Sequence, residues 1–203
     1  MFLLVQISDL HIRPRGLPVN RISETNTLTE RAIDVIRLLE PKPQAVLVTG
    51  DITDSGTERE YERARILLDR LNLPYFLIPG NHDRRRAMQA AFADLDWMPK
   101  EGPIRFAVEV GDRRLICLDT LVEGEGGGRV GEEQLAWLDA ELARHGERPT
   151  IIALHPPPIR TGIVHMDKIA LADANAFVAV VARHAQIERI LCGHLHRPIT
   201  ASI

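Results

Sequence analysis

Short apolar runs recur along the chain and alternate with amphipathic stretches. Most residues in each run are apolar, which is typical of strands buried in a sheet. The runs occupy residues 3–7, 45–49, 75–78, 150–154 and 187–192. Because helix-like stretches separate the first three runs, the pattern predicts consecutive parallel strands joined by helices.

Capping boxes mark where the first two helices are expected to begin. Thr27 and Glu30 have the spacing of a capping box, as do Thr57 and Glu60. The first helix is expected to bury Leu28, Ala32, Val35, Ile36 and Leu39. The second is expected to bury Tyr61, Ala64, Leu67, Leu68 and Leu71. Further helices are expected near residues 85–93, 131–144 and 174–184, and a strand hairpin over residues 104–110 and 114–118.

A short polar motif follows each of the five apolar runs. The motifs are Asp9-Leu10-His11, Gly50-Asp51, Gly80-Asn81-His82-Asp83, His155 and Gly193-His194-Leu195-His196. Ligands bind outside the carboxyl ends of the strands in an open α/β sheet, so the five motifs are expected to converge in space. A lone Asp or His at a strand end is typical of a turn or a cap. Five such motifs in register indicate a common site instead.

The motif side chains offer nitrogen and oxygen donors and no thiolate. Asp9 and His11 are two residues apart, so in an extended segment they would share a face and chelate one ion, and the same holds for His194 and His196. The two carboxylate oxygens of Asp51 could bridge two ions. Such donors suit Mn²⁺, Fe²⁺ or Fe³⁺, Zn²⁺ and Co²⁺. Two divalent ions held by two carboxylates keep a net positive charge, which attracts a phosphodiester anion.

Composition and charge narrow the class of protein. A chain of 203 residues, 45% hydrophobic and 26% charged, matches one globular domain. The net charge is −3, whereas nucleic-acid binders are typically basic. Residues 2–7 are apolar but have neither a basic region before them nor a cleavage site after them. No apolar run approaches the ~20 residues that span a bilayer, so a cytoplasmic protein with no membrane partner is expected.

The five motifs together resemble those of the calcineurin-like metallophosphoesterase superfamily. Within it, the chain most resembles the bacterial class III cyclic-nucleotide phosphodiesterases and the related glycerophosphodiesterases. The narrower resemblance lies in residues 7–11, 13–16, 78–83 and 155–158. The resemblance covers residues 1–196 and implies an α/β fold, a four-layer αββα sandwich of two mixed β-sheets flanked by helices.

The resemblance also implies a role for each motif residue. Two divalent ions would be shared by seven residues, with Asp51 bridging them: Asp9, His11, Asp51 and His196 on one ion, and Asp51, Asn81, His155 and His194 on the other. His82 would contact the phosphate and assist the leaving group, and Asp83 would orient His82.

These features predict a binuclear-metal enzyme that hydrolyses small phosphodiesters, such as 3′,5′-cyclic AMP or glycerophosphodiesters. The alternatives are a phosphomonoesterase or nuclease of the same fold, and a non-catalytic interaction domain. The near-neutral charge and the lack of a groove of aromatic and basic residues disfavour a nucleic acid polymer as partner. The presence of His82 and all four histidine ligands disfavours a non-catalytic domain.

The resemblance implies further strands after the Gly-His-x-His block, which complete the second sheet in relatives. The chain ends at Ile203, so a single domain over residues 1–203, truncated at its C-terminus, is expected. The edge of the 104–118 hairpin is then expected to promote self-association into a homo-oligomer. Substrate contacts would come mostly from residues 12–22 and 156–168, and discrimination among diesters is expected to be weak. Arg13, Arg15 and His165 lie in these segments.

Overall fold

Two β-sheets form the centre of the computed structural model, which describes residues 2–14, 17–19 and 24–202. The first sheet contains parallel strands in the order β1 (Leu4–Ile7), β2 (Ala45–Thr49) and β3 (Tyr75–Ile78). The second has the order β4 (Phe106–Val110), β5 (Arg113–Cys117), β6 (Thr150–Ala153) and β7 (Ile187–Leu191). In this sheet β4 and β5 are antiparallel, whereas β5, β6 and β7 are parallel.

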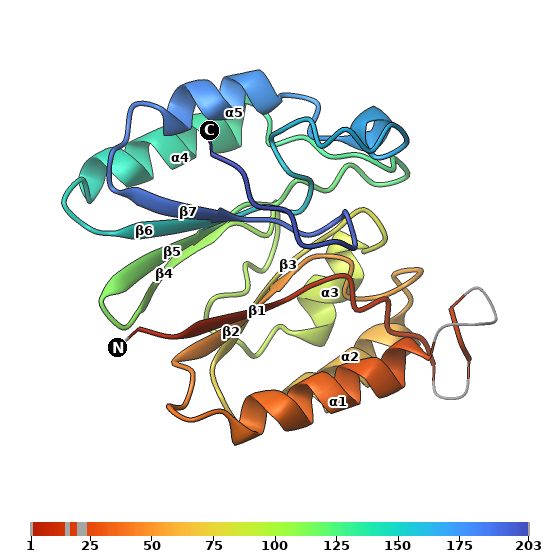
Figure 1. The fold of residues 1–203 in the computed structure, drawn as a ribbon. Coiled ribbons are helices and arrows are strands. Elements are labelled where there is room, and N and C mark those ends of the chain that lie inside the picture. Colours follow the sequence, from red (N-terminus) through yellow and green to blue (C-terminus); the bar gives the residue numbers. More distant parts are fainter. Residues whose placement is uncertain (1, 15–16, 20–23, 203) are drawn as a thin grey trace.

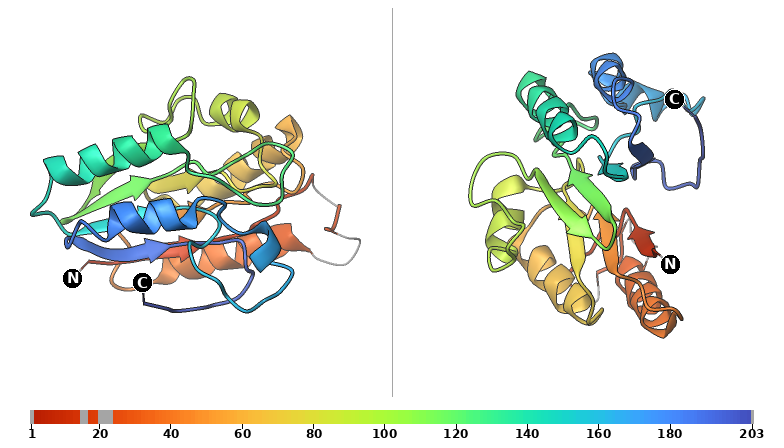
Figure 2. Two further views of the ribbon diagram at one scale, coloured as in Figure 1. Left: turned by 90° about the horizontal axis from the view of Figure 1, so that it is seen from above. Right: turned by 90° about the vertical axis from the view of Figure 1, so that its left-hand side faces the viewer.

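Helices cover the outer face of each sheet. On the first sheet lie α1 (Thr25–Leu38), α2 (Glu58–Asp69) and α3 (Arg85–Ala91), and on the second lie α4 (Glu132–Arg144) and α5 (Ala174–Val181) (Figures 1 and 2). A short 3-10 helix (Asp167–Ile169) precedes α5. The predicted αββα sandwich is confirmed. The three described strands of the first sheet are all parallel, so only the second sheet is mixed.

Alternation along β5 divides the apolar core into two layers. Leu115 and Cys117 pack with the first sheet, whereas Ile116 packs with Leu138 of α4 and Phe177 of α5. This is the two-residue period of a strand that is covered on both faces. The same burial holds for β2, where all five residues are buried. The strands are therefore held by packing on both faces, which fixes the points where the loops at their ends begin.

The second capping box is confirmed, and the helix buries the predicted side chains. The Thr57 hydroxyl accepts a hydrogen bond from the Glu60 amide, and the Glu60 carboxylate accepts one from the Thr57 amide. The predicted face of α2 is fully buried at Tyr61, Ala64, Leu67 and Leu68, with Leu71 just beyond the helix.

The first capping box is wrong, because α1 begins at Thr25 and places residues 27–30 inside the helix. The buried stripe is Thr29, Ile33 and Ile36, whereas Leu28 and Val35 are 60% and 61% exposed. Apolar residues occupy neighbouring positions along this helix, so the sequence is compatible with two phases. In the observed phase Ile33 and Ile36 pack in the core, and the Thr25 hydroxyl donates to the backbone carbonyl of His11 at 2.8 Å.

The remaining predicted elements occur within a few residues of their expected bounds. The hairpin of β4 and β5 turns at Gly111, where φ is 58°. Among the described residues, no helix is both long and apolar enough to span a membrane.

Candidate metal centre

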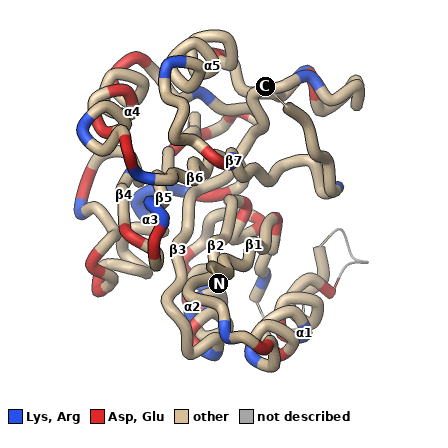
Figure 3. The backbone as a smooth tube through the Cα atoms, turned by 60° about the vertical axis from the view of Figure 1, so that its left-hand side comes forward, with Lys and Arg blue, Asp and Glu red and all other residues tan. Residues whose placement is uncertain are grey.

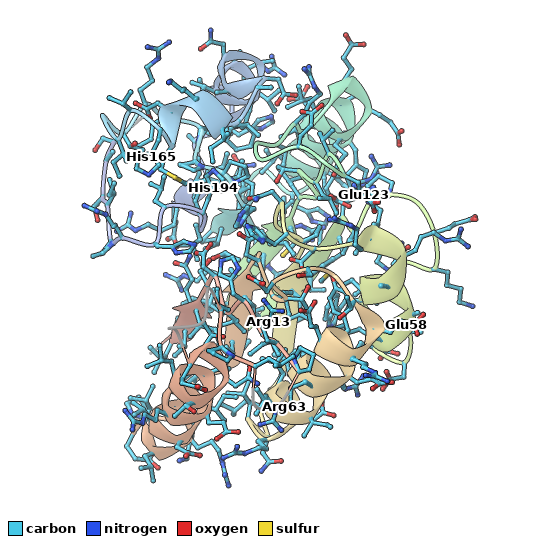
Figure 4. The ribbon with its side chains drawn as sticks, turned by 90° about the vertical axis from the view of Figure 1, so that its right-hand side faces the viewer. Arg13, Glu58, Arg63, Glu123, His165 and His194 are labelled. Atoms are coloured by element: carbon cyan, nitrogen blue, oxygen red, sulfur yellow. The ribbon has the colours of Figure 1, made fainter. Side chains whose placement is uncertain are left out.

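The five polar motifs converge at the carboxyl ends of the strands. They follow β1, β2, β3, β6 and β7, whose ends lie at one side of the sandwich (Figure 1). Figure 4 looks onto this side, with Arg13 and His194 on loops from the two halves of the molecule. Hydrogen bonds join these loops, since the His194 amide donates to the Asp9 carboxylate at 3.0 Å and the Gly193 amide donates to the His155 carbonyl at 3.0 Å.

A first group of donors contains Asp9, His11, Asp51 and His196. Each offers one ligand atom, and these atoms all lie within 4.8 Å of one another. The Nε2 atoms of His11 and His196 are 3.2 Å apart. Asp51 Oδ2 lies 3.6 Å from His11 Nε2, and Asp9 Oδ1 lies 3.4 Å from His196 Nε2. This spacing leaves room for one cation between the four side chains.

A second group contains Asp51, Asn81, His155 and His194. His155 Nε2 lies 3.4 Å from Asp51 Oδ2 and 3.2 Å from Asn81 Oδ1. His194 Nδ1 lies 3.0 Å from the same Asn81 oxygen. Asp51 Oδ2 therefore belongs to both groups, while the backbone amide of His82 donates to Asp51 Oδ1 at 2.9 Å and holds the carboxylate in place.

Backbone carbonyls determine the tautomers of two of these histidines. A carbonyl oxygen only accepts, so His155 Nδ1–H donates to Thr49 at 2.8 Å and His194 Nε2–H donates to Ile169 at 3.0 Å. The second ring nitrogen of each then presents its lone pair to Asn81 Oδ1. Lone pairs that converge in this way need a cation or a proton between them. The donor set thus fits a divalent ion bound by nitrogen and oxygen.

The backbone is strained at the motif residues. A positive φ, which is unusual for a residue with a Cβ atom, occurs at Asp9 (56°), His11 (41°), Asp51 (48°), His194 (74°) and His196 (51°). Asn72 is the one other non-glycine residue with positive φ in the described part of the chain. Each left-handed residue costs roughly 1–2 kcal/mol. Such strain is concentrated at functional sites, where the surrounding structure maintains it.

The positive φ angles contradict the prediction that the paired motif residues lie on extended segments. Asp9 and His11 do lie in the same group of donors, but the backbone brings them there through left-handed residues and not along a strand. The backbone at His194 and His196 is left-handed as well. His194 joins the second group while His196 joins the first, so this pair does not chelate a single ion.

The motif glycines allow the loops to approach one another closely. A Cβ atom on Gly80 would lie 2.2 Å from Asp51 Oδ1, and one on Gly193 would lie 2.1 Å from Ser8 Oγ. A side chain at either position would push apart two loops that carry donors. The glycines are therefore needed for the convergence of the motifs.

Comparison with known proteins agrees with this geometry. A family model described as calcineurin-like phosphoesterase matches residues 2–198. The chain belongs to this family. Its similarity extends to a probable glycerophosphodiester phosphodiesterase from Arcobacter nitrofigilis, which is 34% identical over 200 residues, covering 98% of this chain and 73% of the relative.

Two further similarities agree with the assignment of the chain to this family. A 3′,5′-cyclic adenosine monophosphate phosphodiesterase from Pseudomonas aeruginosa is 30% identical over 196 residues, covering 96% of this chain and 70% of the relative. The crystal structure of a dimetal phosphatase from Danio rerio matches with a TM-score of 0.75 at 18% identity, covering 96% of this chain and 82% of that one. The second likeness shows the fold alone. The predicted family resemblance is confirmed, and with it a site for divalent metal.

Burial and neighbouring charges set the protonation of the second group in this phosphoesterase. Burial by itself lowers the pKa of His155, but the Asp51 carboxylate raises it to about 9. Burial and the nearby His155 lower the pKa of His194 to about 4. Burial raises the pKa of Asp51, yet His155 outweighs this effect and holds the pKa well below its usual range. Asp51 is therefore ionised, and its negative charge faces the histidines of both groups.

The predicted role of Asp83 in orienting His82 stays a prediction, and among the described residues no hydrogen bond joins the two side chains. Asp83 is fully buried, and its carboxylate accepts hydrogen bonds from the amides of Ile52, Thr53 and Gly80 and from two hydroxyls. The His82 ring is oriented differently, because its Nδ1–H donates to the backbone carbonyl of Asp54 at 2.8 Å. Asp83 is a positioning residue that ties the loops carrying Asp51 and Asn81 together.

The loop residues expected near the substrate have different surroundings. Arg13 donates to Asp54 Oδ2 at 2.9 Å, so its guanidinium is partly occupied. Arg15 lies outside the described residues, as do the other positions of the 12–22 segment at 16 and 20–22. His165 is exposed on the loop before α5 (Figure 4). The sequence analysis missed Asp54, although an acidic residue three positions after Asp51 was a visible signal.

Proposed function

We propose that this chain is a metal-dependent phosphodiesterase that hydrolyses small phosphodiesters with two divalent ions. One ion would be held by Asp9, His11, Asp51 and His196, and the second by Asp51, Asn81, His155 and His194. The observation that carries the proposal is the position of Asp51 Oδ2, within 3.6 Å of His11 Nε2 and 3.4 Å of His155 Nε2. A single carboxylate oxygen thus faces ligand atoms of both groups, as expected of a bridging ligand.

The motif residues have separable roles in the proposed reaction. When bound, a pair of divalent ions would stabilise negative charge on a phosphoryl group and make water more acidic. The Nδ1–H of His82 donates to the Asp54 carbonyl, so Nε2 is the nitrogen left for the substrate. When Nε2 also carries a proton, this N–H would bind a phosphate oxygen or give its proton to the departing alkoxide. Asn81 contributes a neutral oxygen, so the second group keeps more positive charge for the anionic substrate than a carboxylate would allow.

Similar proteins narrow the substrate class. The Arcobacter relative is named a glycerophosphodiester phosphodiesterase and the Pseudomonas relative a cyclic adenosine monophosphate phosphodiesterase. We propose a diester of one of these two types for this chain, with Mn²⁺, Fe²⁺ or Fe³⁺, Zn²⁺ or Co²⁺ as the metals. In Figure 3, Asp and Glu lie beside Lys and Arg along α1, α2 and α4. This mixture of charges favours a small substrate over a nucleic acid polymer.

Comparing diester and monoester hydrolysis tests the proposal. The purified chain is loaded with Mn²⁺ and assayed on bis(p-nitrophenyl) phosphate and on p-nitrophenyl phosphate, before and after dialysis against EDTA. We expect Mn²⁺-dependent turnover that favours the diester, followed by turnover of 3′,5′-cyclic AMP or a glycerophosphodiester. Faster hydrolysis of the monoester would support the phosphomonoesterase alternative. No turnover with metal bound would support a non-catalytic domain.

The single domain over residues 1–203, its C-terminal truncation, self-association and cytoplasmic location stay predictions. The edge of β4 is the proposed contact for self-association, because β4 pairs with β5 on one side and with no other named strand among the described residues. Light scattering of the purified chain measures its mass directly, and a monomer would contradict the prediction.

A further inference from the structure

We propose that a cleft between α3 and α4 binds a phosphomonoester, at a site separate from the metal centre. The cleft has a volume of about 660 Å³, which lies within the range of small-molecule sites. Its walls come from α3, from the segment that follows α3, from the loop after β5 and from the residues that precede α4. None of the seven proposed metal ligands, all of which the structure describes, lines the cleft, and neither does His82. The proposal does not depend on the function proposed above.

Basic side chains from three separate segments line the cleft. Arg86 belongs to α3, Lys100 to the segment after α3, and Arg129 to the segment before α4. All three are exposed, and none of them forms an ion pair with another residue in the described part of the chain. Cations that line one cleft without acidic partners repel one another, and an anion bound between them would remove this repulsion. The cleft therefore has the charge of an anion site.

The buried part of the cleft is electrically neutral, because Arg85 and Asp119 pair with each other. Asp119 is buried, and its carboxylate accepts from Arg85 Nε at 2.6 Å and from the amides of Ile104 and Leu121 at 2.8 and 2.9 Å. Arg85 Nη2 also donates to the Leu121 carbonyl at 2.7 Å. The Asp119 carboxylate is thus fully engaged with these donors. It is therefore not the counterion of the three outer basic side chains.

Nearby acidic side chains leave most of this positive charge uncompensated. Glu101 is exposed and lines the cleft. Glu133, at the start of α4, accepts from Arg105 at 2.7 Å, and Glu123, on the loop beside α3, accepts from the Arg85 amide at 3.1 Å (Figure 4). Apart from the internal pair, three basic side chains and one acidic side chain line the cleft, a net charge of +2 in a chain of net charge −3. A phosphomonoester carries about −1.5 to −2 at neutral pH, which matches this charge.

The size and lining of the cleft favour an organic phosphate over inorganic phosphate. The guanidinium groups of Arg86 and Arg129 offer paired N–H donors that match two oxygens of a phosphate. A Cβ atom on Gly102 or on Gly131 would meet no atom within 4 Å, so the cleft is open at both glycines. An organic group attached to the phosphate would have apolar surface to contact, from Pro103, Leu121 and Val122. Phosphate alone would leave this surface and most of the volume unused.

Isothermal titration of the full chain with 5′-AMP tests the proposal, in EDTA so that the metal centre holds no ion. We expect saturable binding of 5′-AMP, weaker binding of inorganic phosphate and no binding of adenosine. The double variant Arg86→Ala/Arg129→Ala should lower the affinity for 5′-AMP about tenfold or more, because two charged donors to the phosphate are lost. The matched control Arg31→Ala/Arg37→Ala removes the same charge from exposed positions of α1 and should bind 5′-AMP within about twofold of the wild type.

The proposal is overturned if the wild type does not bind 5′-AMP, or if the cleft variant and the α1 control bind it equally well. Equal affinity for inorganic phosphate and 5′-AMP would contradict the assignment to an organic phosphate. Thermal unfolding of each variant separates misfolding from a local effect, and Arg86→Gln/Arg129→Gln replaces the alanine pair if that pair is unstable. Turnover of bis(p-nitrophenyl) phosphate at saturating Mn²⁺ should stay within about twofold in the cleft variant, since the cleft contains no metal ligand. If the wild type hydrolyses no diester, the proposed function fails, while the titration still tests the cleft.

Discussion

Replacing Asp83 by Asn should destabilise the protein strongly, although the two side chains have nearly the same shape. Asp83 Oδ1 accepts hydrogen bonds from the Thr53 amide at 3.1 Å, the Thr53 hydroxyl at 3.0 Å and the Tyr61 hydroxyl at 2.9 Å. Oδ2 accepts from the amides of Ile52 and Gly80, at 3.1 and 2.8 Å. The carboxylate is fully buried, so water cannot replace either oxygen.

The expected cost follows from this geometry. An Asn side chain has one acceptor oxygen, and its NH₂ group only donates. If NH₂ takes the place of Oδ2, the amides of Ile52 and Gly80 lose their acceptor; if it takes the place of Oδ1, the Thr53 amide does. A buried unsatisfied donor costs about 1–3 kcal/mol, and the remaining bonds lose their charge assistance. We therefore expect Asp83→Asn to lower the free energy of unfolding by about 2–5 kcal/mol.

Urea denaturation of the metal-free protein, followed by circular dichroism, measures this change. Asp96→Asn replaces an exposed carboxylate and serves as the control, with an expected change within about 0.5 kcal/mol. The variant and the wild type should have similar m-values, so that the midpoints can be compared. A loss of less than about 1 kcal/mol for Asp83→Asn would refute the reasoning, because the five bonds would then contribute little to stability.

Three further predictions concern the loops and the metals. Gly193→Ala should cost about 1–3 kcal/mol of unfolding free energy, since its Cβ would lie 2.1 Å from Ser8 Oγ. Gly146→Ala is the control, because its Cβ would meet no atom nearer than the Ala143 carbonyl oxygen at 4.0 Å. Equal stability of the two variants would contradict the close approach. Mn²⁺ at 100 times its Kd should stabilise the fold by about 2.7 kcal/mol. Calorimetry should show a rise in Tm with Mn²⁺ that EDTA reverses. An unchanged Tm would contradict binding of Mn²⁺ to the folded state. His82→Ala should lower kcat and keep both ions, whereas Asn81→Ala should lower the affinity of one ion in a Mn²⁺ titration. Loss of metal from His82→Ala would show that the role of His82 is misassigned.

Much of the fold is predictable because burial leaves a direct signature in the sequence. Strands covered on both faces, such as β2, appear as uninterrupted apolar runs, and parallel strands bring their carboxyl ends to one edge. The convergence of the motif at Asp9 with that at Asp51 follows from this rule, because β1 and β2 are neighbours in one sheet and the amide of His11 donates to the Asp51 carbonyl. The capping box at Thr57 succeeded for a similar reason, because its two hydrogen bonds are local.

Features that depend on contacts between distant segments could not be predicted from the sequence. The phase of α1 depends on tertiary contacts that its periodicity does not reveal: Ile33 and Ile36 pack in the core, and Thr25 bonds to the loop after β1. The left-handed backbone at Asp9 and His194 is maintained by the loops packed against it, so it is invisible in a motif. The role of Asp83 is hidden for the same reason, since its partners Ile52 and Gly80 belong to two different loops.

The metal content of the wild type and of Asp51→Ala tests the central claim most directly. Both proteins are saturated with Mn²⁺, freed of excess metal by gel filtration and measured by inductively coupled plasma mass spectrometry, with His196→Ala as the comparison. A shared Asp51 oxygen, 3.6 Å from His11 Nε2 and 3.4 Å from His155 Nε2, predicts two ions per wild-type chain, the loss of both in Asp51→Ala and the loss of one in His196→Ala. One ion per wild-type chain, or an Asp51→Ala variant that keeps an ion at wild-type affinity, would contradict the account.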